Sequence, residues 1–207
     1  MTRALADAIR WTREGTKLVL DAVAELDEAA FAGPSALPGW TRGHLIAHLA
    51  ANAEALRNLV GWAATGVEKP MYASPEERAE GIAQGATLSA DRLGLWLDHA
   101  ADALDVGMSE LSASDWEREI RTAQGRTVPA SEIPWLRARE VMVHAVDLDH
   151  GIGFADLPDD FLEALVADIL RKRGDVTVPH APLADVAAWL SGRPHGIAGV
   201  PELGPWL

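Results

Sequence analysis

Apolar residues recur every three or four positions along most of the chain, a spacing that is typical of amphipathic helices rather than of strands. The pattern predicts long helices at residues 5–26, 41–66, 89–111 and from near Ser131 to Gly151, with a shorter one at 74–85. Thr41 and Ser89 suit N-caps at the starts of two of them. Gly66 suits a helix end, and Pro75 suits a first helical turn. Four long helices in one chain favour a four-helix bundle.

The segments outside these helices are shorter and less regular. Between the third and fourth long helices, β-prone residues flank Gly125, so we expect a small hairpin or an extended loop with a turn there. Near the C-terminus the pattern predicts helices at 159–172 and 183–191 with a short strand, "DVTV", between them. The expected fold class is therefore mainly α, with a four-helix bundle over residues 1–157 and a small C-terminal domain, α/β or mainly α, over residues 158–207.

Composition narrows the function further. The chain has 207 residues, 48% of them hydrophobic, which is enough for the core of one domain with a small appendage. It has no apolar run of about 18 residues and no apolar segment of the signal-peptide kind, so we expect a cytoplasmic protein with no membrane partner. A net charge of −13 argues against a nucleic-acid partner, and an anionic substrate would need locally concentrated arginines. The absence of cysteine excludes disulfides and catalysis by a protein thiol.

The fourth long helix carries an unusual polar stripe on an otherwise apolar segment. Arg137, Glu140, His144 and Asp147 recur at intervals of three and four, so they share one face. Glu140 and His144 can form an ordinary ion pair on the helix surface. The neighbouring apolar residues indicate burial instead, and a buried carboxylate beside a histidine needs strong compensation, which a metal ion supplies.

The second long helix offers two further candidate ligands, His44 and His48, which are also four residues apart. One of them together with Glu140 and His144 would make three nitrogen and oxygen ligands, the set typical of catalytic zinc. The spacing alone does not choose between the two histidines. Asp147 suits either an acceptor that orients a ligand or a solvated carboxylate at the helix end.

Three arginines are candidates for binding an anionic substrate. Arg137 and Arg139 can hold carboxylates through paired hydrogen bonds, or they can be surface charges near the start of the helix. Arg126 lies in the predicted loop near Gly125, and binding residues are often found on loops.

Three segments of the sequence resemble a known family. "LPGWTRGHLIAHLAANAEALRNLVGWAATG" and "TAQGRTVPASEIPWLRAREVMVHAVDL" are similar to the two signatures of the DinB-like metal-binding bundles, in their maleylpyruvate isomerase branch. "KPMYASPEERAEGIAQG" between them also fits, so the resemblance covers roughly residues 10–157.

The resemblance implies a metal site and a reaction. It places the ligands of a zinc ion, or of another divalent metal, on His48, Glu140 and His144, and an arginine needed for activity on Arg193 in "VAAWLSGRPHG". The implied reaction is the isomerisation of maleylpyruvate to fumarylpyruvate through addition of the mycothiol thiolate, rotation and elimination. Asn52 and Arg126 are the expected pocket residues for substrate and thiol. A monomer is favoured over a dimer.

One departure from the family is clear. The stretch "GDVTVPHA" is shorter than the family's pattern, which has additional strands, so the C-terminal domain is expected to be abbreviated. A changed C-terminal domain leaves open a mycothiol-dependent S-transferase acting on another electrophile. A separate alternative is a metal-binding module without enzymatic activity.

Overall fold

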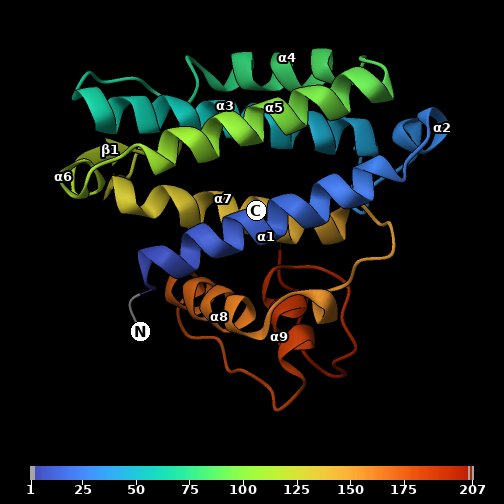
Figure 1. The fold of residues 1–207 in the computed structure, drawn as a ribbon. Coiled ribbons are helices and arrows are strands. Elements are labelled where there is room, and N and C mark those ends of the chain that lie inside the picture. The colour runs from blue at the N-terminus through green and yellow to red at the C-terminus, as the bar shows by residue number, and fades with distance from the viewer. Residues whose placement is uncertain (1–2, 205, 207) are drawn as a thin grey trace. The chain divides into compact units, whose positions relative to one another are not determined.

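The computed structural model describes residues 3–204 and 206, and the chain divides into two compact units that meet between His150 and Gly151. The first unit is built on four long helices that run side by side (Figure 1). They are α1 (Leu5–Ala24), α3 (Arg42–Thr65), α5 (Ala90–Ser109) and α7 (Ile133–Asp147). Helix α1 packs mainly on α7, and α3 packs mainly on α5, with α3 also contacting α7. The prediction of a mainly α fold with a four-helix bundle is confirmed.

The helix ends follow the caps in the sequence. The Thr41 side chain accepts a hydrogen bond from the backbone N–H of His44 at the start of α3, and Gly66 ends that helix in the left-handed conformation. Two short helices, α2 (Glu28–Ala32) and α6 (Ala113–Trp116), were not predicted, because four or five residues show no helical period. Helix α1 is two residues shorter than predicted, and α7 begins after a 3₁₀ turn at Ala130–Glu132.

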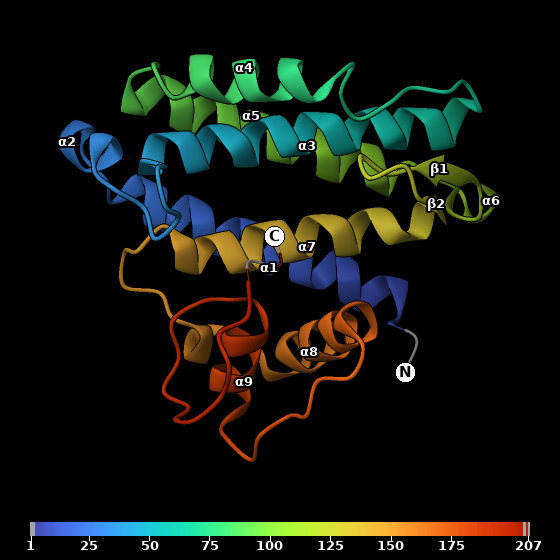
Figure 2. The same cartoon turned by 180° about the vertical axis from the view of Figure 1, so that it is seen from behind.

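Helix α4 (Pro75–Gly85) lies along α3 and is reached by an irregular segment that follows α3 (Figure 2). The Ser74 side chain caps it, and Pro75 occupies its first turn. Gly85 allows a close approach, because a Cβ there would lie 2.6 Å from the Trp96 ring and 2.8 Å from Cβ of Ala47. This contact fixes the end of α4 against α3 and α5.

The predicted hairpin is present. Strands β1 (Glu119–Arg121) and β2 (Thr127–Pro129) pair in antiparallel register, and Gly125 turns the chain with a φ of 76°. Ile120 on β1 is buried against residues of α3 and α5, so the hairpin closes one end of the bundle. No helix in the described part of the chain is long and apolar enough to cross a membrane.

The second unit contains a 3₁₀ turn (Phe154–Asp156), α8 (Asp159–Arg173) and α9 (Leu183–Leu190). Apolar residues of both helices form its core, and the indole N–H of Trp189 donates to the carbonyl of Pro201. The strand predicted at 175–178 is wrong: the described residues after His150 contain no strand, so this unit is α rather than α/β. A segment of four residues cannot form a stable strand without a partner, and Val178 is 41% exposed. The boundary predicted after residue 157 stays a prediction.

Candidate metal centre

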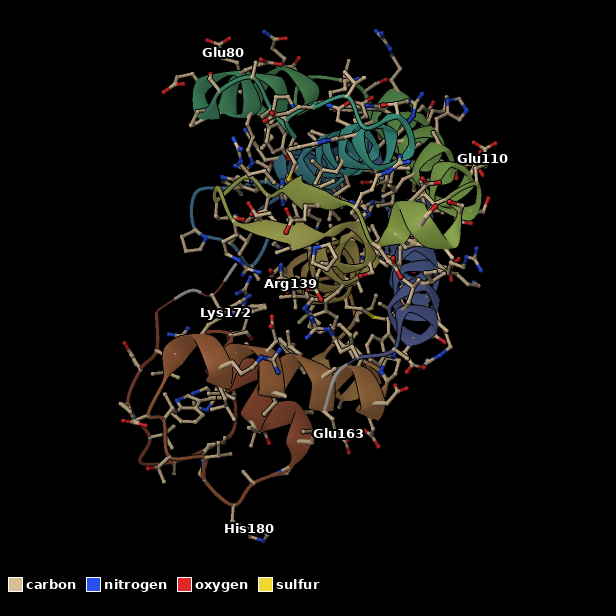
Figure 3. The ribbon with its side chains drawn as sticks, turned by 90° about the vertical axis from the view of Figure 1, so that its left-hand side faces the viewer. Glu80, Glu110, Arg139, Glu163, Lys172 and His180 are labelled. Carbon is tan, nitrogen blue, oxygen red and sulfur yellow. The ribbon has the colours of Figure 1, made fainter. Side chains whose placement is uncertain are left out.

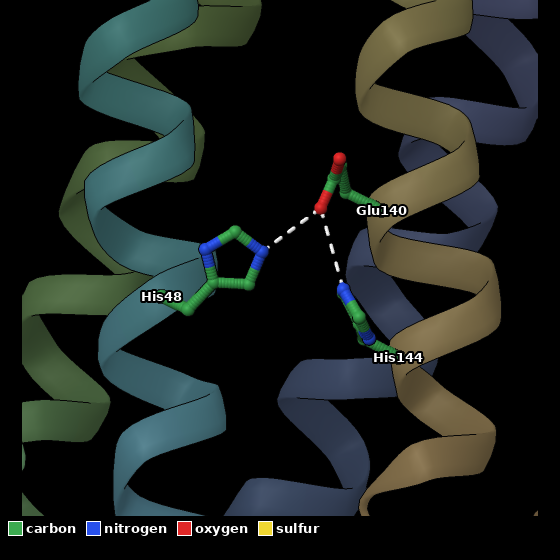
Figure 4. Close-up of side chains that lie close together, drawn as sticks. All are labelled: His48, Glu140 and His144. Carbon is green, nitrogen blue, oxygen red and sulfur yellow. Dashed lines mark hydrogen bonds and ion pairs between the residues drawn. The ribbon is translucent and has the colours of Figure 1, made fainter. Parts of the chain in front are cut away.

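Helices α3 and α7 bring together one histidine from α3 and a carboxylate and a histidine from α7. Oε2 of Glu140 lies 2.9 Å from Nε2 of His48 and 3.3 Å from Nε2 of His144 (Figure 4). One ligand atom from each of the three residues lies within 4.8 Å of the others. Glu140 and His144 share a face of α7 because they are four residues apart. The nitrogen and oxygen atoms therefore converge on one small volume between two helices.

Burial and hydrogen bonding set the charges in this cluster. The side chains of His48 and His144 are 6% and 5% exposed, and that of Glu140 is 18% exposed. Burial by itself would raise the pKa of Glu140, but hydrogen bonds with His144 and His48 outweigh it and hold that pKa well below its ordinary range. Burial lowers the pKa of His48. The cluster thus presents a carboxylate beside imidazoles.

His144 is held in place from its other side. Nδ1 of His144 lies 2.8 Å from Oδ2 of Asp147, and Asp147 is only 1% exposed. Burial would lower the pKa of His144, but the hydrogen bonds with Asp147 and Glu140 raise it overall. A carboxylate behind a histidine ligand fixes which ring nitrogen carries the proton and how the ring is oriented. The sequence left two alternatives for Asp147. Its burial excludes a solvated carboxylate at the helix end, and its contact with His144 is that of an acceptor which orients the ring.

These residues fit a divalent metal ion. Two imidazole nitrogens and one carboxylate oxygen are ligands typical of catalytic zinc, and three protein ligands leave a position open for water or substrate. The hydrogen bond from Nδ1–H of His144 to Asp147 leaves Nε2, the ring nitrogen that faces Glu140, as the atom that would coordinate a metal.

The cluster lies at the wall of a cavity of about 600 Å³. Its lining comes from α3, α7, α4, the segment before α4 and the β1–β2 hairpin. His48 and Glu140 face it together with Asn52, Tyr72, Arg78 and Arg139. Arg139 is labelled in Figure 3 near the hairpin. The cavity can admit a small molecule to the metal ligands.

Residues 12–149 match the family described as the mycothiol maleylpyruvate isomerase N-terminal domain. A crystal structure of the mycothiol-dependent maleylpyruvate isomerase is 40% identical to the chain, with a TM-score of 0.91 and with 100% of each chain covered. This chain belongs to the mycothiol maleylpyruvate isomerase family. The crystal structure of a variant of such an isomerase, with one histidine replaced by alanine, is 39% identical, with a TM-score of 0.90 and the same coverage. No curated protein matches the chain.

The resemblance to this family is therefore confirmed. The structure also separates the two histidines that spacing could not separate. Nδ1 of His44 lies 2.7 Å from Oγ1 of Thr41, and His44 is not part of the cluster. The cluster contains His48, as the family resemblance implied. That these three residues ligate a metal stays a prediction.

The other predicted site residues lie in different environments. Asn52 lines the cavity, and its Oδ1 accepts a hydrogen bond from Nη1 of Arg137 at 2.9 Å. Arg126 is exposed beside the hairpin turn and is not among the residues that line the cavity, although its neighbours from Arg121 to Gly125 are. Arg193 is 7% exposed in the C-terminal unit, where it donates to the carbonyl of Ser191. Its role in activity stays a prediction.

Arg137 and Arg139 are not surface charges. Arg137 is 0% exposed and also donates to the carbonyl of Leu49, and burial lowers its pKa to about 10. Two of its nitrogens, Nε and Nη2, have no hydrogen-bond partner among the described residues. Arg139 is 8% exposed and lines the cavity.

Two residues near the cluster were not singled out from the sequence. Arg78 and Tyr72 line the cavity, and Cζ of Arg78 lies 5.8 Å from the centre of the Tyr72 ring. Both lie in "KPMYASPEERAEGIAQG", the segment between the two family signatures. An arginine in the first turn of a short capped helix was the available signal, but nothing in the sequence places that helix over His48.

Proposed function

We propose that this protein isomerises maleylpyruvate to fumarylpyruvate with mycothiol as thiol cofactor, at a divalent metal site formed by His48, Glu140 and His144. The observation that supports this most strongly is the alignment, 40% identical over the whole of both chains, with an isomerase of that name. The convergence of the three side chains at a cavity wall supplies the chemistry. Zinc is the proposed metal, since three nitrogen and oxygen ligands suit it.

The reaction needs a nucleophile that this chain does not contain. Rotation about the double bond requires that it become a single bond. Addition of a thiolate to the alkene carbon forms a C–S bond and moves the π electrons onto the conjugated carbonyl as an enolate. After rotation, the enolate electrons restore the double bond in the trans geometry, the C–S bond breaks and the thiolate is recovered. The chain has no cysteine, so the thiol is supplied from outside.

The residues of the cluster prepare this chemistry. A bound divalent cation supplies positive charge that favours the thiolate form of an incoming thiol. Glu140, kept ionised by its two histidine neighbours, contributes one negative charge to the ligand set. Asp147 keeps the His144 ring oriented from behind. Asn52 lies in the cavity wall, where we propose that it contacts bound ligand.

Further assignments belong to the same proposal. Arg193 is proposed to hold a substrate carboxylate and to stabilise the enolate. Arg126 is proposed to contact the thiol cofactor from the hairpin. We further propose that the bundle and the C-terminal domain divide near residue 157. We also propose that the protein is a cytoplasmic monomer without nucleic-acid or membrane partners.

The test is an isomerase assay with purified zinc-loaded protein, maleylpyruvate and mycothiol. His48→Ala should abolish turnover, whereas His99→Ala, an exposed histidine on α5, should retain it. Turnover that requires mycothiol and is lost only in the first variant supports the reaction and the ligand set. No turnover by folded, zinc-bound protein rejects the isomerase function and favours a transferase with another electrophile or a module without activity.

A further inference from the structure

The ring of His48 is held on both sides, and its second partner is Arg78. Nδ1 of His48 lies 3.2 Å from Nη2 of Arg78, while Nε2 faces Glu140 at 2.9 Å. Arg78 lies in the first turn of α4, which its Ser74 cap and the close contact at Gly85 hold against the bundle. The guanidinium thus comes from a helix other than those that carry the three ligands.

The partner determines where the proton of His48 lies. A guanidinium can only donate hydrogen bonds, so Nδ1 of His48 must be the acceptor. The ring proton is therefore on Nε2, which donates it to Glu140. His144 has the opposite arrangement, because its Nδ1 faces the carboxylate of Asp147. Nδ1 of His144 therefore carries a proton, as coordination through Nε2 requires, whereas Nδ1 of His48 does not.

Metal binding is incompatible with this arrangement at His48. Coordination through Nε2 uses the lone pair of that nitrogen, so the ring proton must move to Nδ1. Nδ1 would then be a donor facing the donor nitrogens of Arg78. Two donors cannot share a hydrogen bond, so the bond between Arg78 and His48 has to break when the metal binds through Nε2.

Arg78 is placed to bind something else once that bond is broken. It is half-buried and lines the cavity of about 600 Å³ beside the cluster, and also a second cavity of about 590 Å³. No carboxylate among residues 3–204 forms an ion pair with it. Arg121 also lines the cavity beside the cluster, but its Nη1 already lies 3.5 Å from Oε1 of Glu68. Arg78 is therefore a positive charge at the cavity wall that the protein itself does not neutralise with an ion pair.

We propose that Arg78 binds a carboxylate of the substrate after metal loading has released it from His48. The substrate class, an unsaturated dicarboxylate, rests on the proposed function. While a metal holds Nε2 of His48, the guanidinium cannot bond to Nδ1, and we expect it to turn toward the anion. This coupling gives a chain of net charge −13 a local cation for a dianionic substrate.

Two binding measurements test the proposal, both on the full chain and neither dependent on turnover. Arg78→Met is compared with Arg92→Met, which removes the same charge from an exposed position on α5. The first measurement is zinc affinity by competition with a chelator. Arg78→Met should bind zinc several-fold more tightly than wild type, because no hydrogen bond has to break and a nearby positive charge is gone. Zinc affinity that is unchanged or weaker would overturn the coupling.

The second measurement is the binding of maleate, an unreactive dicarboxylate, to zinc-loaded protein by calorimetry. Arg78→Met should lose about tenfold or more in maleate affinity, as expected for a lost charge-assisted hydrogen bond, and Arg92→Met should match wild type. Arg78→Lys should recover part of the affinity because it keeps the charge. Equal maleate affinities for wild type and Arg78→Met would overturn the assignment. If the protein binds zinc and maleate as expected but does not isomerise maleylpyruvate, only the proposed function fails.

Discussion

Replacing Asp147 by asparagine should weaken metal binding about tenfold. Oδ2 of Asp147 lies 2.8 Å from Nδ1 of His144, and the two side chains are 1% and 5% exposed. The contact fixes the proton on Nδ1 and places negative charge behind a ligand of a cation. Asparagine keeps the shape and one accepting oxygen but removes the charge.

The magnitude follows from the type of hydrogen bond and from its burial. A hydrogen bond to a charged group contributes about 1.5–3 kcal/mol, and one between neutral groups about 0.5–1.5 kcal/mol. The substitution exchanges the first type for the second, and the centres of the two ranges differ by about 1.25 kcal/mol, which corresponds to nearly a factor of ten in affinity. Because Asp147 and His144 are almost inaccessible to water, solvent does not replace what is lost.

The assay is a competition titration of zinc against a chelator of known affinity near neutral pH. Asp149→Asn is the matched control, since this carboxylate is two residues further along and its side chain is 74% exposed. The control should bind zinc within about twofold of wild type, as expected for an exposed charge. Asp147→Asn with wild-type affinity, or an equal loss in both variants, would refute the argument that Asp147 supports the metal through His144.

Zinc at a hundred times its dissociation constant should raise the free energy of unfolding by about 2.7 kcal/mol, and Glu140→Gln should remove most of that gain in thermal melts. Gly15→Ala should be less stable than Gly61→Ala by about 1–3 kcal/mol in urea titrations. A Cβ at Gly15 would lie 2.6 Å from Cγ2 of Val141, whereas nothing lies within 4 Å at Gly61, so equal stabilities would contradict the close packing of α1 on α7. Burial raises the pKa of Tyr72, the only tyrosine, so its phenolate absorbance should appear at higher pH in the folded than in the denatured protein. Because the folded state keeps this proton longer, the contribution of Tyr72 to stability is present below pH 10 and falls as the pH rises above about 10.

The sequence predicted the long helices well because their ends carry local signals. Thr41 accepts a hydrogen bond from a backbone N–H at the start of α3, and Gly66 ends that helix, as the residue types indicated. Ser89 stands at the N-cap position of α5 as predicted, but its side chain makes no capping hydrogen bond. The polar stripe on α7 could also be predicted from the sequence, because residues three and four apart on a helix must share a face. Burial of the intervening valines and methionine makes the stripe unusual, and the structure shows that burial.

Contacts between distant segments could not be predicted in the same way. His44 and His48 have the same spacing pattern, and only the N-cap at Thr41, which takes the Nδ1 side of His44, separates their roles. Arg78 reaches His48 from 30 residues away, on a helix whose direction depends on the packing of Gly85. The sequence therefore pointed to Arg126, Arg137 and Arg139, which lie within or beside the family signatures. It did not point to Arg78, the arginine that contacts His48.

The hydrogen bonds of the cluster bear on how a metal would enter it. Glu140 is paired with His48 and His144, and these in turn with Arg78 and Asp147, so the polar atoms at the centre have partners within the protein. A buried site satisfied in this way does not need a metal in order to fold, unlike a small domain built around structural zinc. Binding must instead displace the bonds of His48 to Glu140 and Arg78, which lowers the net affinity relative to a fully preset site. We therefore expect that the bundle folds without a metal and that a bound metal ion exchanges with solution. The position of the Arg78 side chain should differ between the two forms.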